Sequence, residues 1–314
     1  DTLSLSDSLR LVSGLNYRYD RASSETYFNG TLDDTTWRAF GQLEWRATDH
    51  WLLQGGAMFE DTQLIGSSLT PRFAINYLIN PRHGLRAVYS EAIRSPDMFE
   101  NNVNWSYQVS KLRPSAYGKS SARYFVKTRG PGDLDQEHMR SRELGYNGYF
   151  AEWGLAVDVK LFYDEITGMI SEPLRNNQYI ASNANSSRFR GTETQLDWRV
   201  NTVDRLRFTY AYVDAEASNP LDQQFTASHS GSAGWLRDWG HGWNSALFYY
   251  GDNALNGYRF ERVDTRIAKR MTLGKAQLEL AGVLQQRLDH EPTTFVDNNY
   301  DERRVMYVSA ELEF

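Results

Sequence analysis

Long runs in which apolar and polar side chains alternate residue by residue constrain this chain more than any other feature. In the final stretch, RRVMYVSAELEF, every second side chain from Met306 to Phe314 is apolar or small. Side chains of a β-strand alternate between its two faces, so this segment has one apolar and one polar face. Strands of soluble sandwiches are usually near five or six residues long, whereas a tilted strand needs about ten to cross a bilayer. The pattern therefore predicts strands that cross a membrane.

The same alternation recurs along the whole chain and predicts about 14 strands, an even number, as expected for a transmembrane barrel. Three segments, 225–237, 242–250 and 258–270, alternate less clearly than the others. No repeat or linker divides the chain, so we predict one domain over residues 1–314, an all-β, antiparallel, up-and-down transmembrane barrel. The predicted strands cover roughly 8–20, 36–47, 51–60, 70–79, 84–92, 136–150, 154–166, 188–200, 205–213, 225–237, 242–250, 258–270, 276–287 and 303–314.

Composition agrees with a barrel and excludes several other classes of protein. With 40% hydrophobic residues and a mean hydropathy of −0.61, the sequence has no apolar run long enough for a membrane-spanning helix. A barrel strand needs apolar residues at alternate positions only. Cysteine is absent, which excludes disulfides and thiolate chemistry, and a net charge of −6 without a basic block argues against nucleic-acid binding. The chain begins at Asp1 without a signal peptide.

Short and long connections alternate between the predicted strands. Short turns fall near 48–50, 80–84, 151–154, 201–205, 238–242 and 273–275, and the longer polar segments are 20–36, 61–69, 93–135, 167–187, 214–224, 251–257 and 288–302. This asymmetry is typical of outer-membrane barrels, which have tight periplasmic turns and long outer loops. Indole rings prefer the membrane interface, so tryptophans beside the short turns predict a periplasmic girdle. These residues are Trp45, Trp51, Trp153, Trp198, Trp239 and Trp243.

Several motifs, in order, resemble the C-terminal barrel region of TonB-dependent outer-membrane receptors. They are LVSGLNYRYD at 11–20, LTPRFAINYLINPRHGLRAVYSEAIRSPDMFE at 69–100, DLDQEHMRSRELGYNGYF at 133–150, LFYDEITGMI at 161–170 and RFRGTETQLDW at 188–198. The chain departs from the family pattern in two places. Asp135-Gln136-Glu137 stands where the family usually has Lys-Pro-Glu, and LQQRLDHEP at 284–292 replaces an Asn-Leu-Phe-Asp-like turn.

The resemblance implies an integral protein of the bacterial outer membrane that takes up a small solute, such as an iron–siderophore chelate. It also implies about 22 strands, an N-terminal plug and TonB as a partner, with TonB expected only if a plug precedes this chain. No plug-like segment or TonB box is found in the sequence. If the 314 residues close by themselves, strand 8–20 must pair with strand 303–314, because an unpaired edge in lipid is very costly. A fragment of a larger barrel is the competing interpretation.

Two groups of residues are candidates for function. The longest polar segment, 93–135, interleaves aromatic and arginine side chains, which suits an anionic or aromatic ligand such as a metal chelate. Its alternatives are a constriction folded into the lumen and simple surface shielding. Its candidate ligand residues are Trp105, Tyr107, Arg113, Tyr117, Arg123 and Tyr124.

Charged residues at alternate strand positions predict either a pore lining or cross-strand ion pairs that merely satisfy the wall. The predicted pore-lining residues are Arg38, Glu44, Arg46, Arg72, Arg86, Glu193, Asp197, Arg199, Arg207, Arg266 and Glu279, with Arg10, Arg18, Arg262, Asp264, Glu311 and Glu313 on the same predicted face.

Enzyme and metal chemistry have weak support in the sequence, and we expect no enzyme activity, no cofactor and no metal site. Asp297, Asp301 and Glu302 suit Ca²⁺, but a solvated acidic loop is the simpler interpretation. The Glu137-His138 pair has no accompanying nucleophile motif. We expect contacts with outer-membrane lipid and lipopolysaccharide, and a metal chelate as a possible ligand. The alternatives to a receptor are a plugless passive pore and a non-transporting barrel that displays loops for adhesion or phage.

Overall fold

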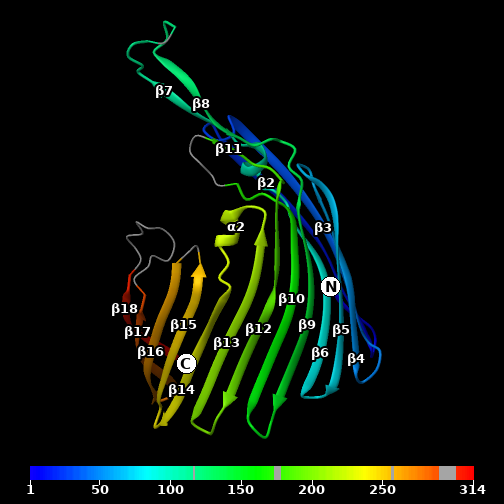
Figure 1. Ribbon diagram of the computed structural model, residues 1–314, viewed down its shortest axis with the longest axis vertical. Coiled ribbons are helices and arrows are strands. Elements are labelled where there is room, and N and C mark those ends of the chain that lie inside the picture. Colours follow the sequence, from blue (N-terminus) through cyan, green and yellow to red (C-terminus); the bar gives the residue numbers. More distant parts are fainter. Residues whose placement is uncertain (116, 173–177, 256–257, 290–301) are drawn as a thin grey trace.

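The computed structural model describes residues 1–314 except 116, 173–177, 256–257 and 290–301. Most of the chain forms one curved antiparallel sheet of 15 strands, each of them hydrogen-bonded to its neighbours in chain order (Figure 1). The strands of this sheet are β1 (Thr2–Ser6), β2 (Leu9–Ser24), β3 (Gly30–Arg46), β4 (Trp51–Thr62), β5 (Gly66–Asn80), β6 (His83–Arg94), β9 (Glu137–Phe150), β10 (Leu155–Met169), β12 (Asn185–Arg199), β13 (Asp204–Ala217), β14 (His229–Gly240), β15 (Trp243–Leu255), β16 (Tyr258–Leu273), β17 (Ala276–Arg287) and β18 (Arg304–Glu313).

Every predicted segment is a strand of this sheet, including the three that alternate poorly. One strand was missed: β1 is short and hairpins onto β2, with Leu3 opposite Leu11. Three connections predicted to be long are short. Strands β2 and β3 remain paired as far as Ser24 and Gly30, β4 and β5 as far as Thr62 and Gly66, and β15 and β16 as far as Leu255 and Tyr258. Their polar residues mark where the strands leave the apolar band rather than where the strands end.

The predicted pairing of the first and last long strands is wrong. Strand β2 pairs with β1 and β3, and β18 pairs with β17 alone among the described residues. The sheet therefore has two open edges, β1 and β18. Every residue of β18 is exposed, including Val308 on its apolar face. Among the described residues the sheet curls without closing, and β1, not β2, forms the first edge.

The strand register aligns apolar side chains of neighbouring strands on one face of the sheet. Leu15 lies opposite Ala39, Ala39 opposite Phe59, Leu144 opposite Leu161, and Phe208 opposite Ala233, so one apolar face continues from strand to strand. Large apolar side chains on this face are exposed, as a lipid-facing wall requires. The opposite face carries charged residues along the length of the strands, whereas charged residues of the apolar face lie towards the strand ends. The described residues contain no helix long and apolar enough to span a membrane.

Tryptophans on the apolar face gather at the short-turn end of the sheet. Trp51 packs on Tyr77 with ring centroids 4.7 Å apart, and the indole N–H of Trp198 donates to the Trp153 carbonyl at 2.9 Å. The Trp239 indole donates to Ser245 at 2.9 Å, and Lys269 lies 5.1 Å from the centre of the Trp243 ring. Indole rings with a satisfied N–H and an apolar body suit a membrane interface.

A separate folded unit lies at the long-loop end and is called the outer module below. It consists of α1 (Met98–Asn102), β7 (Asn104–Ser110), β8 (Ser121–Arg129) and β11 (Gln178–Ile180), with β7 antiparallel and β11 parallel to β8. The β7–β8 hairpin extends beyond the ends of the sheet strands (Figure 1). The 93–135 segment is thus structured and points away from the sheet, not across its concave side. The other connection with a helix, between β13 and β14, holds α2 (Pro220–Gln224).

Candidate functional site: the outer module and the polar wall

The outer module has the hydrophobic core that the sheet lacks. Val103, Leu134, Ile170, Tyr179 and Ala181 are buried together, and Phe99 and Trp105 pack against them. These residues come from the two long connections on either side of β9 and β10, so the core joins both connections into one unit. Burial raises the pKa of the Tyr179 phenol to about 12, which keeps it neutral at any physiological pH.

Helix α1 is set by a capping box that the sequence SPDMFENN already contains. The Asp97 carboxylate accepts from the Glu100 backbone N–H at 2.7 Å, and the Glu100 carboxylate accepts from the Asp97 N–H at 2.9 Å. This reciprocal pair satisfies free N–H groups of the first turn. Within the helix, Asn101 is 1% exposed and its side-chain oxygen accepts from the Leu134 N–H at 3.1 Å. The helix thereby fixes both ends of the hairpin.

An ion-pair cluster joins the module to the sheet. Arg94, at the end of β6, donates to both carboxylate oxygens of Glu137 at 2.7 Å and to Glu100 at 3.0 Å. Glu137 also accepts from the Ile170 N–H at 2.7 Å. Burial raises the pKa of Glu137, but the bonds from Arg94 and Ile170 outweigh it and hold that pKa below its ordinary value. Glu137 is therefore a charged structural anchor, which leaves no free base for a Glu137-His138 pair.

A polar tether holds the hairpin against residues 25–29, the connection between β2 and β3. The Asn29 side-chain oxygen accepts from Ser106 and from Arg123, both at 2.7 Å, and its amide donates to the Asn104 carbonyl at 2.6 Å. Arg123 also donates to Glu25 at 3.0 Å. Glu25 and Asn29 were not predicted as site residues, since nothing local to them in the sequence indicates a partner in β7 and β8.

The six candidate ligand residues divide into two groups. Trp105 packs on Tyr27 with ring centroids 5.2 Å apart, and Arg123 belongs to the tether, so both position the hairpin. Tyr107 and Tyr124 lie opposite each other in the hairpin register and are exposed. Arg113 and Tyr117 lie in the exposed tip, where Tyr117 is fully exposed. Strand β7 was not predicted, although apolar and polar residues alternate in its sequence NWSYQVS.

All the predicted pore-lining residues lie on the polar face of the sheet. Eight of them make cross-strand contacts in pairs or small clusters: Glu44 with Arg10 at 3.0 Å, Glu193 with Lys160 at 3.0 Å, Arg86 with Asp158 at 3.7 Å, Asp197 with Arg207 at 3.2 Å, Arg38 with Glu60, and Arg266 with Glu279. This pairing is what a wall that satisfies its own charges requires. Arg46, Arg72 and Arg199 have no side-chain hydrogen bond or ion pair within the described part of the chain, and their role as a pore lining stays a prediction.

Two of the three acidic residues that suit Ca²⁺ cannot be placed. Asp297 and Asp301 lie outside the described residues, as does His290. Over the residues that the structure does describe, no group of three His, Cys, Asp or Glu side chains is placed to hold a metal ion.

Comparisons with known proteins agree with this architecture. Residues 1–281 match the family described as TonB dependent receptor-like, beta-barrel. A segment of 116 residues is 28% identical to the vitamin B12 transporter BtuB of Vibrio cholerae and covers 35% of this chain and 18% of that protein.

Two solved structures share the fold at low sequence identity. The siderophore receptor PirA of Pseudomonas aeruginosa superposes with a TM-score of 0.72 at 13% identity, over 100% of this chain and 55% of its own. PirA of Acinetobacter baumannii gives 0.68 at 14% identity, over 96% of this chain and 52% of its own. The chain thus spans about half the length of these receptors. Because the family match extends over most of its residues, this chain belongs to the TonB-dependent receptor-like β-barrel family.

Proposed function

We propose that this chain forms part of the wall and the outer binding surface of a bacterial outer-membrane receptor that takes up a small solute. The solute class we favour is an iron–siderophore chelate, and the proposal is for transport rather than catalysis. Family membership and the siderophore receptors of similar fold support this choice. TonB, outer-membrane lipid and lipopolysaccharide are the proposed partners, with TonB acting through a plug supplied outside these residues.

The observation that carries the proposal is the outer module. A long connection that merely shielded the surface would need neither a buried core nor a capped helix nor a tether to residues 25–29. Here all three hold a hairpin that presents Tyr107 and Tyr124 side by side. Paired aromatic rings with Arg113 nearby in the chain suit a flat, anionic metal chelate through stacking and charge-assisted hydrogen bonds.

Replacing both exposed tyrosines tests the proposal. Tyr107→Ala with Tyr124→Ala removes the stacking surface and leaves Trp105, Arg123 and the core intact. Stacking contributes about 1 kcal/mol per ring, so we expect binding of ferric enterobactin to weaken about tenfold or more. Binding is measured with radiolabelled iron on outer membranes that contain the complete receptor, with vitamin B12 as a second probe.

Tyr149→Ala is the matched control, because Tyr149 is exposed but lies at the short-turn end of the sheet. It should bind as the unmodified protein does. Unchanged binding of both probes in the double variant would remove the hairpin from the ligand site. Wild-type protein that binds neither probe would refute the proposed solute class.

A further inference from the structure

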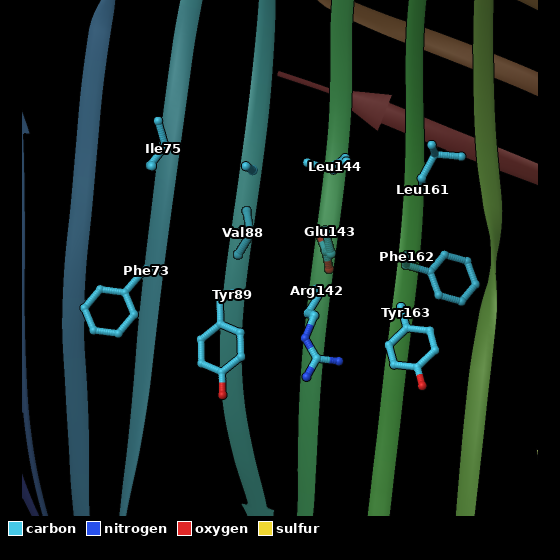
Figure 2. Close-up of a pocket in the computed structure, with 11 residues that line it drawn as sticks. Phe73, Ile75, Val88, Tyr89, Arg142, Glu143, Leu144, Leu161, Phe162 and Tyr163 are labelled. Atoms are coloured by element: carbon cyan, nitrogen blue, oxygen red, sulfur yellow. The ribbon is translucent and has the colours of Figure 1, made fainter.

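A groove on the apolar face of the sheet lies near the middle of its strands, away from the tryptophans. It has a volume of about 450 Å³. It runs across β5, β6, β9 and β10, where the small side chain of Ala87 lies between Ile75 and Leu144 in the strand register. Phe73 and Leu161 line its sides, and the rings and branched side chains around it are exposed (Figure 2). An indentation among large apolar side chains on a lipid-facing wall has the shape and chemistry of an acyl-chain site.

A row of polar groups closes the outer end of this groove. The register aligns Tyr89, Arg142, Tyr163 and Arg190 across four strands on the same face as Phe73 and Leu144. Figure 2 shows the Arg142 guanidinium between the rings of Tyr89 and Tyr163. Arg142 lies 5.4 Å from the centre of the Tyr163 ring and donates to Glu165 at 3.0 Å. These contacts hold the guanidinium in place at the mouth of the groove.

A second charged row lies one pair further out and contains Glu91, Arg140, Glu165 and Arg188. Arg140 is loosely held, since its nearest carboxylate, that of Glu91, is 3.8 Å away and its side chain is 61% exposed. A guanidinium has five N–H donors, and one distant carboxylate leaves most of them available. Acidic residues neutralise part of the arginine charge in these rows. The N–H donors of Arg140 and Arg142 that have no acidic partner form an accessible cationic site, called the cationic point below.

Strand geometry places these rows at a membrane boundary. From Phe150, which packs on Trp153 at the short-turn end, to Arg140 the strand rises about 34 Å at about 3.4 Å per residue. A tilt of about 40° reduces this to about 26 Å along the membrane normal. The apolar band of outer-membrane barrels is about 25 Å tall. Arg140 therefore lies at the level of the outer-leaflet headgroups. Arg142 lies about 5 Å deeper along the membrane normal, between Arg140 and the groove, and its long side chain can extend outward to the same level.

We propose that this face binds a phosphate-bearing lipid, with the phosphate held by Arg140 and Arg142 and one acyl chain in the groove over Ala87. The inference rests on the proposed membrane location, and it concerns a site separate from the outer module. Arg–phosphate hydrogen bonds are strong and directional, and the acyl chain adds contacts that free phosphate cannot make. A lipid with both parts is therefore the occupant that this geometry selects.

Two variants separate the two halves of the site. Arg140→Gln with Arg142→Gln removes the cationic point, while Ala87→Leu fills the groove. Native mass spectrometry of the complete receptor in detergent, with dioctanoyl phosphatidic acid and dioctanoyl phosphatidylcholine as probes, measures retention. We expect the unmodified protein to prefer phosphatidic acid, the arginine variant to lose that preference by tenfold or more, and Ala87→Leu to weaken retention of both lipids.

Matched controls lie elsewhere on the same face. Arg21→Gln changes an exposed arginine paired with Asp33 on β2 and β3, and Ala39→Leu enlarges an alanine between Leu15 and Phe59. Both should retain lipid as the unmodified protein does. The inference is overturned if the unmodified protein shows no preference, if Arg21→Gln lowers it equally, or if inorganic phosphate displaces the lipid at equal concentration. Ferric-chelate binding measured on the same samples reports on the proposed function independently.

Discussion

At the scale of single residues, the outer module depends on a few close approaches that only particular side chains allow. Gly130 follows β8 at the point where the chain meets the end of α1, and its N–H donates to the Val103 carbonyl at 2.7 Å. A Cβ at this position would lie 2.3 Å from the Asn101 backbone. Backbone atoms cannot move aside as the end of a flexible side chain would. Only glycine therefore allows this close approach of the two segments.

Gly130→Ala should therefore loosen the module without disturbing the sheet. Overpacking of this kind costs about 1–3 kcal/mol, and we expect faster amide hydrogen exchange in β7 and β8. Gly41→Ala is the control, because nothing lies within 4 Å of a Cβ there. Equal exchange in the two variants would contradict the proposed packing.

At the scale of elements, charged residues at the outer end of β6 and β9 link the sheet to the outer module, and these two parts are stabilised by different interactions. The sheet strands are held by their backbone ladders, whereas the outer module is held by its own core and by Arg94, Glu100 and Glu137. Glu137 lies beyond the level of Arg140 and so outside the apolar band. The donors of Arg94 and Ile170 favour the ionised form of its carboxylate.

This link gives the module a defined pH dependence. The folded-state pKa of Glu137 lies below its ordinary value of about 4.5, so its stabilisation is fully present above that pH. The stabilisation is lost as the pH falls through the lower, folded-state pKa. We expect hydrogen exchange at the Ile170 amide to accelerate as the pH is lowered towards 3, after correction for intrinsic exchange. Glu137→Gln should abolish this change, and an unaltered pH profile in that variant would assign the effect to another group.

At the scale of the whole molecule, the arrangement of the edges decides what these residues form. An antiparallel sheet in lipid must pair every backbone group, and the edges at β1 and β18 are open. The chain's own ends do not meet that need. In lipid, both edges of the described sheet would need a pairing partner.

Paired cysteines test this arrangement. Leu280→Cys with Ala310→Cys joins opposed positions of β17 and β18 and should oxidise to an intramolecular disulfide, because opposed residues of neighbouring strands are within bridging distance. Leu11→Cys with Val308→Cys probes the pairing of the first and last long strands and should remain reduced. Efficient cross-linking of the second pair, seen as a gel shift without reductant, would show that the sheet closes on itself.

Much of the wall followed from the sequence because two-residue alternation is a local property. Leu144 and Leu161 are apolar at the positions their strands expose to lipid, and Glu193 and Asp197 are charged at positions on the other face, before any pairing is known. Strand β1 was missed because five residues carry too little alternation to stand out. The ends of β2 and β3 were misjudged because polarity reports the surroundings of a strand, while pairing decides its length.

The sequence by itself determined the 14 long strands of the sheet, their two faces, the tryptophan belt and the family. Tertiary structure decided which edges remain open, since β1 and β18 are far apart in the chain and no local pattern records their partners. It also separated the candidate ligand residues, because Arg123 is committed to Asn29 and Glu25 while Tyr107 and Tyr124 face outward. Contacts between distant segments depend on how the whole sheet curves, and that curvature is a property of all its strands together.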